Sequence, residues 1–370
     1  MQNLKNIANI RDEFLAKGWF KHSGAHVLFD GQFGSTGKGL LASVMALALG
    51  DRMNVITTNA GPNSGHTAYF GDEKIMTQQL PVASVFAQRL GHQHLCYLNG
   101  GAVIDPEILA AEVARYGVRA VVHPHAAIID DKCREAKLAH IASTGKGVGP
   151  AMSRKLLRYE GYVAQGHAEA MSEFAELANI VPTGRVFIET AQGFSLGINS
   201  GFYPHVTSRE CTVGQALADA RMSPKSLQRS IVSLRTYPIR VGNLPEGHSG
   251  GWYPDQRELT WDEIGQAPEL TTVTKRVRRV ATFSFEQFAE CLRVNEPDAF
   301  FLNFCNYLSP LMLEALLYKM LKVYRVTLGR DPEIILLGFG PRAEDVVLGT
   351  VIIDRVFFTA PPVTRDEVSA

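Results

Sequence analysis

Near its start the chain reads HVLFD (residues 26–30), GQFGSTGKG (31–39) and LLASVMALAL (40–49). The first piece is short and apolar, as a buried strand is, and the last suits a helix. Between them, glycines bring bare backbone N–H groups and Lys38 brings a positive charge to the expected helix N-terminus. The pattern predicts a strand, a phosphate-binding loop and a helix over 38–49, with a tight turn that binds nothing as the alternative. It is not a standard P-loop, because Gln32 replaces the first glycine and Gly39 replaces the magnesium-binding Ser/Thr.

The rest of the chain alternates apolar runs with helix-like segments. Strand-like runs occur at 55–56, 95–98, 118–122, 186–189, 300–302 and 334–339, and helix-like segments at 106–116, 130–141 and 311–323. This alternation predicts an α/β fold with a large, mostly parallel central sheet flanked by helices. Ligands of such sheets bind beyond the carboxyl ends of the strands, so the loops there are the places to look for chemistry.

Composition excludes several classes of protein. Of the 370 residues 46% are hydrophobic, which suits a globular chain, and Lys+Arg and Asp+Glu both number 37. A balanced charge argues against a protein that holds nucleic acid non-specifically. No apolar run is long enough to span a membrane, and the start is too charged for a signal peptide. The five cysteines form no CxxC pair, so we expect reduced thiols and a soluble cytoplasmic protein.

Four further loops carry candidate chemistry. NAGPNSGHT (59–67) places His66 among glycines and amides, where it suits a general acid, although the motif taken alone favours a turn histidine exposed to solvent. STGKGVGP (143–150) is a second phosphate-type loop, and ETAQG (189–193) follows a predicted strand. TTVTKRVRR (271–279) concentrates four cations, which would bind carboxylates or simply form a solvated face.

In this order, GQFGSTGKG, NSGHT, STGKGVGP, ETAQG, YPHVTS and TVTKRVRR resemble the motif series of the adenylosuccinate synthetases over about 27–345. The resemblance implies a P-loop-related fold and a C–N bond-forming ligase. Such an enzyme phosphorylates O6 of a purine nucleotide and then lets aspartate displace the phosphate. It also implies Mg²⁺ as cofactor and a homodimer. We expect residues 1–25 to be an N-terminal extension and residues 26–370 a single catalytic domain.

The resemblance also assigns roles to particular residues. The catalytic residues would be Ser35, Lys38, His66 and Gln192. The substrate nucleotide would be bound by Asn63, Ser143, Thr144, Arg158, Gln192 and Thr207, with Arg158 reaching across the dimer. Aspartate would be bound by Thr272, Thr274, Arg276 and Arg278. ATP would be bound by Gly34, Ser35, Thr36, Gly37, Lys38, Gly39, Asn306, Gly340 and Pro341, and the metal by Ser35 and Gly65.

Two departures from the family pattern indicate a branch. Ser35 stands where the family has the aspartate that removes the N1 proton, and Thr36 where it has a glutamate. A serine hydroxyl cannot replace a carboxylate as base without a partner, and the smaller, uncharged loop accommodates a guanine-type base. Asn306 stands where an aspartate pairs with guanine of GTP; an amide both donates and accepts, which suits adenine.

Both departures resemble the bacteriophage 2-aminoadenylosuccinate synthases of this family. That branch couples L-aspartate to dGMP with ATP or dATP, giving N6-succino-2-amino-2′-deoxyadenylate. We therefore expect these small molecules as partners, with no nucleic acid or membrane, and the host cytoplasm as location if the chain is phage-encoded. Two alternatives remain: an ordinary adenylosuccinate synthetase that uses IMP and GTP, and a nucleotide-binding sensor without catalysis.

Overall fold

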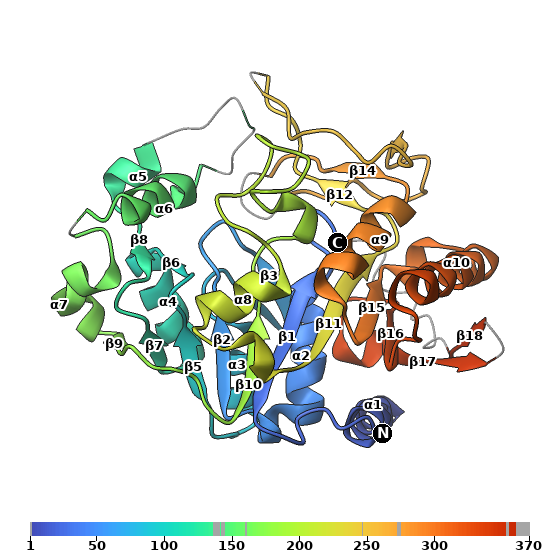
Figure 1. Cartoon of the computed structure of the whole chain (residues 1–370), viewed down its shortest axis with the longest axis horizontal. Coiled ribbons are helices and arrows are strands. Elements are labelled where there is room, and N and C mark those ends of the chain that lie inside the picture. Colours follow the sequence, from blue (N-terminus) through green and yellow to red (C-terminus); the bar gives the residue numbers. More distant parts are fainter. Residues whose placement is uncertain are drawn as a thin grey trace.

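The computed structural model of the chain describes residues 2–135, 141, 145–159, 161–245, 247–271, 275–352 and 355–359. Its centre is an eleven-stranded sheet in the order β18-β17-β16-β15-β11-β1-β10-β2-β5-β7-β9 (Figure 1). From one edge to the other, the strands are β18 (Arg355–Phe357), β17 (Val346–Ile352), β16 (Ile334–Gly338), β15 (Ala299–Asn303), β11 (Leu227–Arg235), β1 (Gly24–Asp30), β10 (Arg185–Glu189), β2 (Val55–Thr58), β5 (Leu95–Leu98), β7 (Ala120–Val122) and β9 (Ala175–Leu177). From β16 to β9 all neighbours are parallel; β17 and β18 are antiparallel. The predicted fold class is confirmed.

Smaller sheets lie over the carboxyl ends of these strands and beside them. They are the hairpin β3 (His66–Phe70) with β4 (Glu73–Thr77), the pair β6 (Val103–Ile104) and β8 (Ala127–Ile128), and the three strands β12 (Ile239–Arg240), β14 (Arg279–Ala281) and β13 (Glu258–Leu259). The last group forms a roof over β1 and β11 (Figure 1). The roof matters because the expected aspartate loop lies within it.

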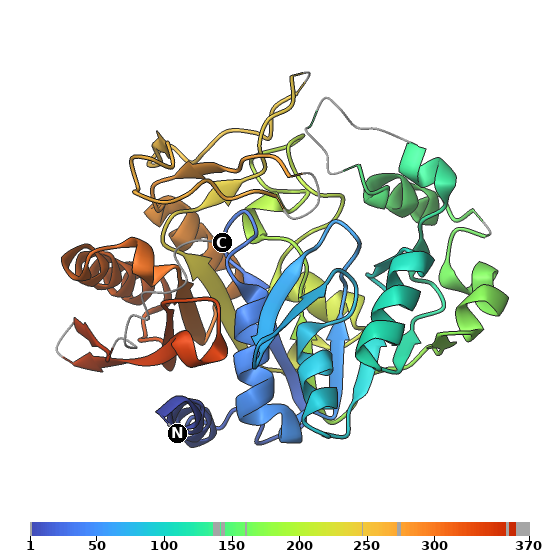
Figure 2. The same ribbon diagram turned by 180° about the vertical axis from the view of Figure 1, so that it is seen from behind.

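Helices cover both faces of the sheet (Figure 2). They are α1 (Gln2–Ala16), α2 (Lys38–Leu49), α3 (Val82–Arg89), α4 (Pro106–Tyr116), α5 (Asp131–Glu135), α6 (Val148–Leu156), α7 (Ala168–Ser172), α8 (Val213–Asp219), α9 (Phe285–Asn295) and α10 (Pro310–Leu328). Short 3₁₀ helices are η1 (Gly50–Arg52), η3 (Ala164–His167), η4 (Phe194–Leu196), η5 (Pro224–Ser226), η6 (Cys305–Tyr307) and η7 (Ala343–Asp345). Among the described residues, no helix has the length and apolarity needed to cross a membrane.

Local sequence explains where several helices begin and end. Asp105 caps α4 by accepting a hydrogen bond from the N–H of Ile108, and Gly117 ends that helix in the left-handed conformation. Ser309 caps α10, with Pro310 in its first turn and Gly329 at its end. These capping side chains satisfy backbone groups that a helix leaves unpaired, and glycine adopts a positive φ without a steric penalty.

The hydrophobic core has two layers, one on each face of the sheet. One layer joins α1, α2, α3 and α4 and includes Phe14, Met45 and Phe86. The other joins α8, α9 and α10 and includes Phe288 and Tyr324. This two-sided burial makes the parallel strands apolar throughout, and so made most of them recognisable in the sequence.

Several parts of the fold differ from what the sequence suggested. Strand β11, next to β1 at the centre of the sheet, was not predicted because it carries buried polar residues such as Ser233 and Arg235. Within residues 1–25, expected to be an N-terminal extension, the side chains of Phe14, Trp19 and Phe20 are fully buried in the core. The predicted helix over 130–141 is described only as α5, since residues 136–140 lie outside the described part. All five cysteines are free.

Candidate active site

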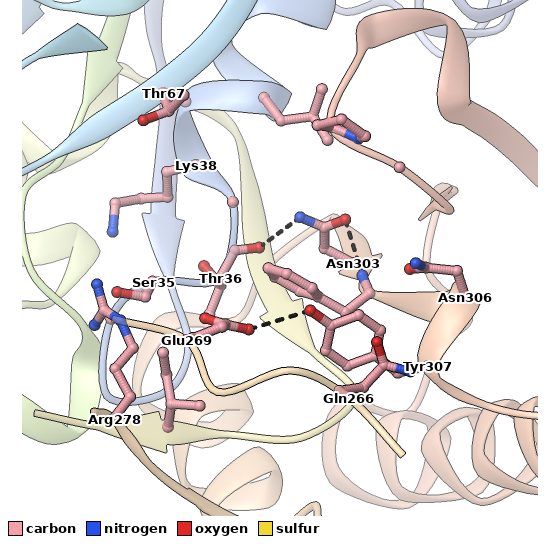
Figure 3. Close-up of a pocket in the computed structure, with 18 of the residues that line it drawn as sticks. Ser35, Thr36, Lys38, Thr67, Gln266, Glu269, Arg278, Asn303, Asn306 and Tyr307 are labelled. Carbon is pink, nitrogen blue, oxygen red and sulfur yellow. Dashed lines mark hydrogen bonds between the residues drawn. The ribbon is translucent and has the colours of Figure 1, made fainter. Parts of the chain in front are cut away.

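A cavity of about 1840 Å³ opens at the carboxyl ends of the central strands. Its walls come from segments that follow β1, β2, β15 and β16 and from the roof, at 33–40, 63–67, 303–308, 339–342 and 265–271. Figure 3 shows side chains from several of these segments lining the pocket. This is the position at which open α/β sheets bind their ligands.

Most of the residues predicted for the site line this one cavity. Those that do so are Gly34, Ser35, Thr36, Gly37, Lys38, Gly39, Asn63, Gly65, His66, Gln192, Arg278, Asn306, Gly340 and Pro341. Three others, Arg158, Thr207 and Arg276, do not line it. Ser143, Thr144, Thr272 and Thr274 lie outside the described residues.

The loop after β1 is shaped to receive an anion. It leads into α2 at Lys38, with Gly37 at a φ of 93° as the residue before the helix. A side chain on Gly37 would come within 2.0 Å of the Asn303 amide, and one on Gly39 within 2.7 Å of the Thr67 carbonyl oxygen. Only glycine fits at these close approaches, which leave backbone N–H groups open at the positive end of a helix.

A buried carboxylate, Asp30, holds this loop from below. Its Oδ1 accepts hydrogen bonds from the N–H groups of Gln32 (2.9 Å) and Gly34 (3.2 Å), and its Oδ2 accepts one from the Thr36 hydroxyl (2.6 Å). The Lys38 ammonium lies 3.3 Å from the same Oδ2. The Thr36 side chain therefore faces the protein interior. The Ser35 hydroxyl, in contrast, is exposed and makes no hydrogen bond within the described part of the chain.

Lys38 joins this loop to the loop after β10. Besides Asp30, its Nζ donates to the Gln192 carbonyl oxygen at 2.7 Å. Gln192 has a positive φ of 64°, and its side-chain amide donates to the Ser64 hydroxyl at 3.3 Å. The lysine expected to hold a phosphoryl group therefore contacts, at one point of the cavity, the backbone of the residue whose side-chain amide is expected to bind a purine.

His66 and Glu189 form a buried pair behind that point. His66 Nδ1 lies 3.5 Å from Glu189 Oε1, and both side chains are almost inaccessible to solvent. Burial, assisted by the charge of Lys38, lowers the pKa of His66 to about 3. Burial raises the pKa of Glu189 to about 7, although the N–H groups of Ala83 and Val82 partly oppose the shift. Without an anionic ligand the imidazole is neutral, and the carboxyl is the more basic partner.

The side of the cavity beside β15 and β16 suits a flat base. Phe304, Asn306 and Tyr307 of the segment 303–308 line it together with Gly340 and Pro341. Asn306 is exposed, and its amide has no hydrogen-bond partner among the described residues. Asn303 is buried instead, with its amide donating to the Thr36 carbonyl oxygen at 3.3 Å. Of the two asparagines, Asn306 is the one available to a ligand.

The roof brings a cationic loop to the opposite wall. Thr271 and Arg276 are joined by backbone and side-chain hydrogen bonds, with the Thr271 N–H donating to the Arg276 carbonyl oxygen at 2.8 Å. The Arg276 guanidinium donates to the Gly242 carbonyl oxygen at 2.9 Å. Burial lowers the pKa of Arg278, which points into the cavity in Figure 3. A partly buried arginine favours an anionic ligand, because a carboxylate would restore the solvation that burial removes.

Two predicted residues lie elsewhere in the monomer. Arg158 follows α6, is exposed and has a positive φ of 61°. It is flanked by Leu157 and Tyr159, which are 60% and 57% exposed. Thr207 is partly buried in the loop after β10, where its N–H donates to the Leu196 carbonyl oxygen at 2.8 Å. Leu196 itself lines the cavity. Thr207 contacts this wall residue from behind and does not line the cavity itself.

A magnesium ion would find few ligands from the protein alone. Among the described residues, no group of three or more His, Cys, Asp and Glu side chains forms a metal cluster. Ser35 and Gly65 are exposed in the cavity and offer a hydroxyl and a backbone carbonyl. Asp30, the carboxylate nearest to Ser35 in sequence, is already occupied by Lys38 and Thr36. This donor set fits an ion that arrives on the phosphates of a nucleotide, as magnesium commonly does.

Sequence reasoning missed four charged residues of the site. Asp30 was read only as the end of a strand, and Glu189 only as the start of ETAQG. Arg235, at the end of β11, and Glu269 in the roof pair with each other at the edge of the cavity. A charged residue at the end of an apolar strand is the signal that would have indicated Asp30 and Glu189. Arg235 had no such signal, because its strand was not recognised.

Known proteins resemble this chain in sequence over most of its length. The family model for adenylosuccinate synthetase matches residues 27–178 and 168–313. N6-succino-2-amino-2′-deoxyadenylate synthase from Vibrio phage phiVC8 is 39% identical over 350 residues, which cover 87% of this chain and 97% of the phage protein. An adenylosuccinate synthetase from Methanocaldococcus jannaschii is 30% identical over 287 residues, or 73% of this chain and 80% of its own length.

A solved structure extends the similarity to three dimensions. Succinoaminodeoxyadenylate synthetase of cyanophage S-2L, bound to dGMP and to dATP as an energy donor, superposes with a TM-score of 0.78 at 31% identity. The match covers 88% of this chain and 95% of the cyanophage chain. Motif order, the strand-end cavity and these matches agree, and the chain belongs to the adenylosuccinate synthetase family.

Proposed function

We propose that this protein is a ligase that joins L-aspartate to C6 of dGMP at the expense of ATP or dATP. The product is N6-succino-2-amino-2′-deoxyadenylate, with ADP or dADP and phosphate as by-products. The names of the phage relatives support this choice within the family, and the bound dGMP and dATP of the cyanophage enzyme support both nucleotides. The sequence departures at Ser35 and Asn306 point the same way.

One contact carries the proposal: the hydrogen bond from Lys38 Nζ to the Gln192 carbonyl oxygen. Lys38 begins α2, where the triphosphate of the donor would lie, and Gln192 would contact the O6 region of the purine. This contact supports a γ-phosphoryl group bound beside O6 of the purine. In the first step O6 attacks that phosphorus, the bond to the bridging oxygen breaks, and ADP leaves. Positioning and charge neutralisation would supply most of the rate, as in other phosphoryl transfers.

The proton at N1 of guanine must leave as O6 is phosphorylated. Ser35 lies at the position where the family has its aspartate base, and no side-chain partner in the described residues activates its hydroxyl. Asp30 cannot serve, because it is buried beneath the loop and paired with Lys38. We therefore assign Ser35 to binding and not to proton removal, and the proton passes to solvent or to a phosphate oxygen.

His66 would act on the departing diphosphate. An incoming triphosphate places negative charge beside the imidazole, which favours its protonated form and opposes the effect of burial. Glu189, at 3.5 Å from Nδ1, would stabilise the imidazolium. The opposite nitrogen would then donate to the bridging oxygen as the phosphoryl group leaves. Magnesium held by the phosphates, Ser35 and Gly65 would neutralise charge on the transferred group.

Aspartate would bind under the roof. The guanidinium groups of Arg276 and Arg278 belong to the cationic loop, and Arg278 lines the cavity. With the aspartate carboxylates held there, the amine attacks C6, the bond from C6 to the phosphorylated oxygen breaks, and phosphate leaves. Thr272 and Thr274 would complete this site by the family resemblance, while Asn63, Ser143, Thr144 and Thr207 would hold the 5′-phosphate of dGMP.

We also propose a homodimer. The end of α6 and the residues after it expose Leu156 (72%), Leu157 (60%) and Tyr159 (57%) around Arg158. Clustered exposed apolar side chains of this kind are typical of protein interfaces. In a dimer, Arg158 would reach the nucleotide phosphate of the partner, which would account for its distance from the cavity of its own chain.

The test is an assay of the purified protein with Mg²⁺ and aspartate, offering dGMP, GMP and IMP in turn with ATP, dATP or GTP. We expect a product from dGMP with ATP or dATP whose mass equals that of N6-succino-2-amino-2′-deoxyadenylate. Lys38→Met serves as the inactive control, since it removes the charge at the phosphates. Turnover only of IMP with GTP would identify an ordinary adenylosuccinate synthetase. Nucleotide binding without any turnover would identify a sensor.

A further inference from the structure

Arg235 is a charged side chain that the proposed reaction does not use. It ends β11, and its side chain is fully buried. Its guanidinium donates to both oxygens of the Glu269 carboxylate and, through Nη1, to the Ser35 carbonyl oxygen at 3.1 Å. Its Cζ lies 3.9 Å from the centre of the Phe304 ring. A buried arginine with this many directed contacts is held in one geometry.

The three partners belong to three different walls of the cavity. Ser35 is in the phosphate loop, where its positive φ of 57° makes its carbonyl orientation specific. Phe304 lines the wall proposed for the donor base, and the Arg235 guanidinium lies over its ring. Glu269 belongs to the roof segment 265–271, which leads into the cationic loop 271–279. A single guanidinium therefore contacts all three proposed subsites.

Glu269 connects Arg235 to the proposed aspartate site through further hydrogen bonds. Its carbonyl oxygen accepts a hydrogen bond from the Arg278 N–H at 2.8 Å, and its carboxylate accepts one from the Tyr307 hydroxyl at 3.3 Å. Figure 3 shows Glu269 between Arg278 and Tyr307. Burial alone would raise the pKa of Glu269, but the charge and hydrogen bonds of Arg235 outweigh it and keep that pKa below its usual value. The carboxylate is thus charged and fixed by Arg235.

From these contacts we propose that Arg235 is a positioning residue that orients the donor-base wall and the aspartate loop together. The inference rests on the proposed function. Its central consequence is that a change at Phe304 alters aspartate binding, although Phe304 belongs to the donor wall. The link runs from the ring to Arg235, from Arg235 to Glu269, and from Glu269 to the backbone of Arg278.

The test uses steady-state kinetics of Arg235→Lys and Phe304→Leu in the full-length protein. Lysine keeps the charge but cannot bridge Glu269 and Ser35 as a fork, so we expect KM for both ATP and aspartate to rise about tenfold. Phe304→Leu should raise KM for ATP by a similar factor and KM for aspartate about threefold. KM for dGMP should stay within about twofold in both, because Asn63 and Gln192 have no contact with Arg235.

The control is Arg229→Lys on the same strand. Arg229 pairs with Glu333 at 2.9 Å, away from the cavity, and its replacement should leave every KM unchanged. The inference is overturned if Arg235→Lys matches this control, or if Phe304→Leu changes KM for ATP alone. Should Arg235→Lys fail to fold, Phe304→Leu alone decides, since its ring is at the cavity wall. If the wild-type enzyme uses IMP and GTP instead, the proposed function fails, yet the same comparison with that pair still tests Arg235.

Discussion

At the scale of single residues, the buried pair of His66 and Glu189 is notable for the pKa values of its two side chains. The two groups face each other across 3.5 Å, and burial moves their pKa values in opposite directions, to about 3 and about 7. Both shifts have the same cause: each group avoids its charged form when no ligand is bound. A bound polyphosphate would reverse the preference at His66. We therefore expect binding of the donor nucleotide to be coupled to protonation of His66.

This pair predicts a particular dependence of stability on pH in the ligand-free protein. Burial raises the folded-state pKa of Glu189 above its ordinary value of 4.5, so its stabilising contribution is present below pH 4.5 and is lost as pH rises through about 7. Glu189→Gln removes this titration but keeps an acceptor for the Ala83 N–H. Between pH 5 and pH 8, the wild type should lose about 2 to 3 kcal/mol more unfolding free energy than the variant.

Urea unfolding at several pH values would measure this difference. The same Asp, Glu and His residues titrate elsewhere in both proteins, so subtracting the two curves isolates Glu189. Parallel curves across this range would show that the Glu189 carboxyl stays ionised in the folded state. The coupling to His66 would then have to be abandoned.

The residues found from sequence are those whose type and spacing carry chemistry by themselves. Lys38 and His66 lie in glycine-rich loops, and the cavity brings them together as expected. Asp30 and Arg235 lie beneath the surface of the cavity and hydrogen-bond to the phosphate loop, while Glu189 faces His66 and accepts from the N–H of Ala83 in α3. Their roles depend on which strands are neighbours in space. A single sequence does not contain that information.

At the scale of elements, buried parallel strands were predicted because they are apolar on both faces. Strand β1 was expected at 26–30 and occupies Gly24–Asp30, while α2 has the predicted bounds. Strand β11 was not predicted, because Ser233 and Arg235 interrupt its apolar pattern. Both residues face the phosphate loop: the Ser233 hydroxyl bonds to Thr36, and Arg235 bonds to Ser35. The polar residues that made this strand hard to recognise in the sequence are the same residues that hydrogen-bond to the phosphate loop.

The short helix η6 offers a test of donor selection. Asn306 is exposed in the cavity without a partner among the described residues, so its amide can meet both the acceptor N1 and the amino group of adenine. In Asn306→Asp the carboxylate only accepts, which opposes adenine N1 and suits the two donors of guanine. We expect the ratio of kcat/KM for ATP to that for GTP to fall about 10- to 100-fold.

Gln266→Glu is the matched control for this prediction. Gln266 lines the same cavity, so the variant introduces the same change from amide to carboxylate at a different point of the wall. It should weaken both nucleotides to a similar extent through charge repulsion and leave the ratio unchanged. An equal shift of the ratio in both variants would mean that added charge, and not contact with the base, explains the effect at Asn306.

At the scale of the whole molecule, the site needs contributions from both faces of the sheet and from the roof. The phosphate loop leads into α2 on one face, η6 leads into α10 on the other, and the cationic loop spans the top. The end of the sheet that carries α6 contributes little to the cavity of its own chain. That end lies far from α10 along the long axis of the molecule (Figure 1). We expect a second copy of the chain to cover its exposed apolar residues.

A charge placed on that surface should separate the two copies. Leu157→Glu puts an unpaired carboxylate into the proposed interface, which costs several kcal/mol when buried, so we expect sedimentation to show a dimer for the wild type and a monomer for the variant. Because Arg158 would then lose its partner, KM for dGMP should rise about tenfold. Leu311→Glu is the control: Leu311 is 77% exposed on α10, and that variant should remain a dimer with unchanged KM. A wild-type protein that sediments as a fully active monomer at micromolar concentration would rule out both the dimer and the role of Arg158 in the partner's site.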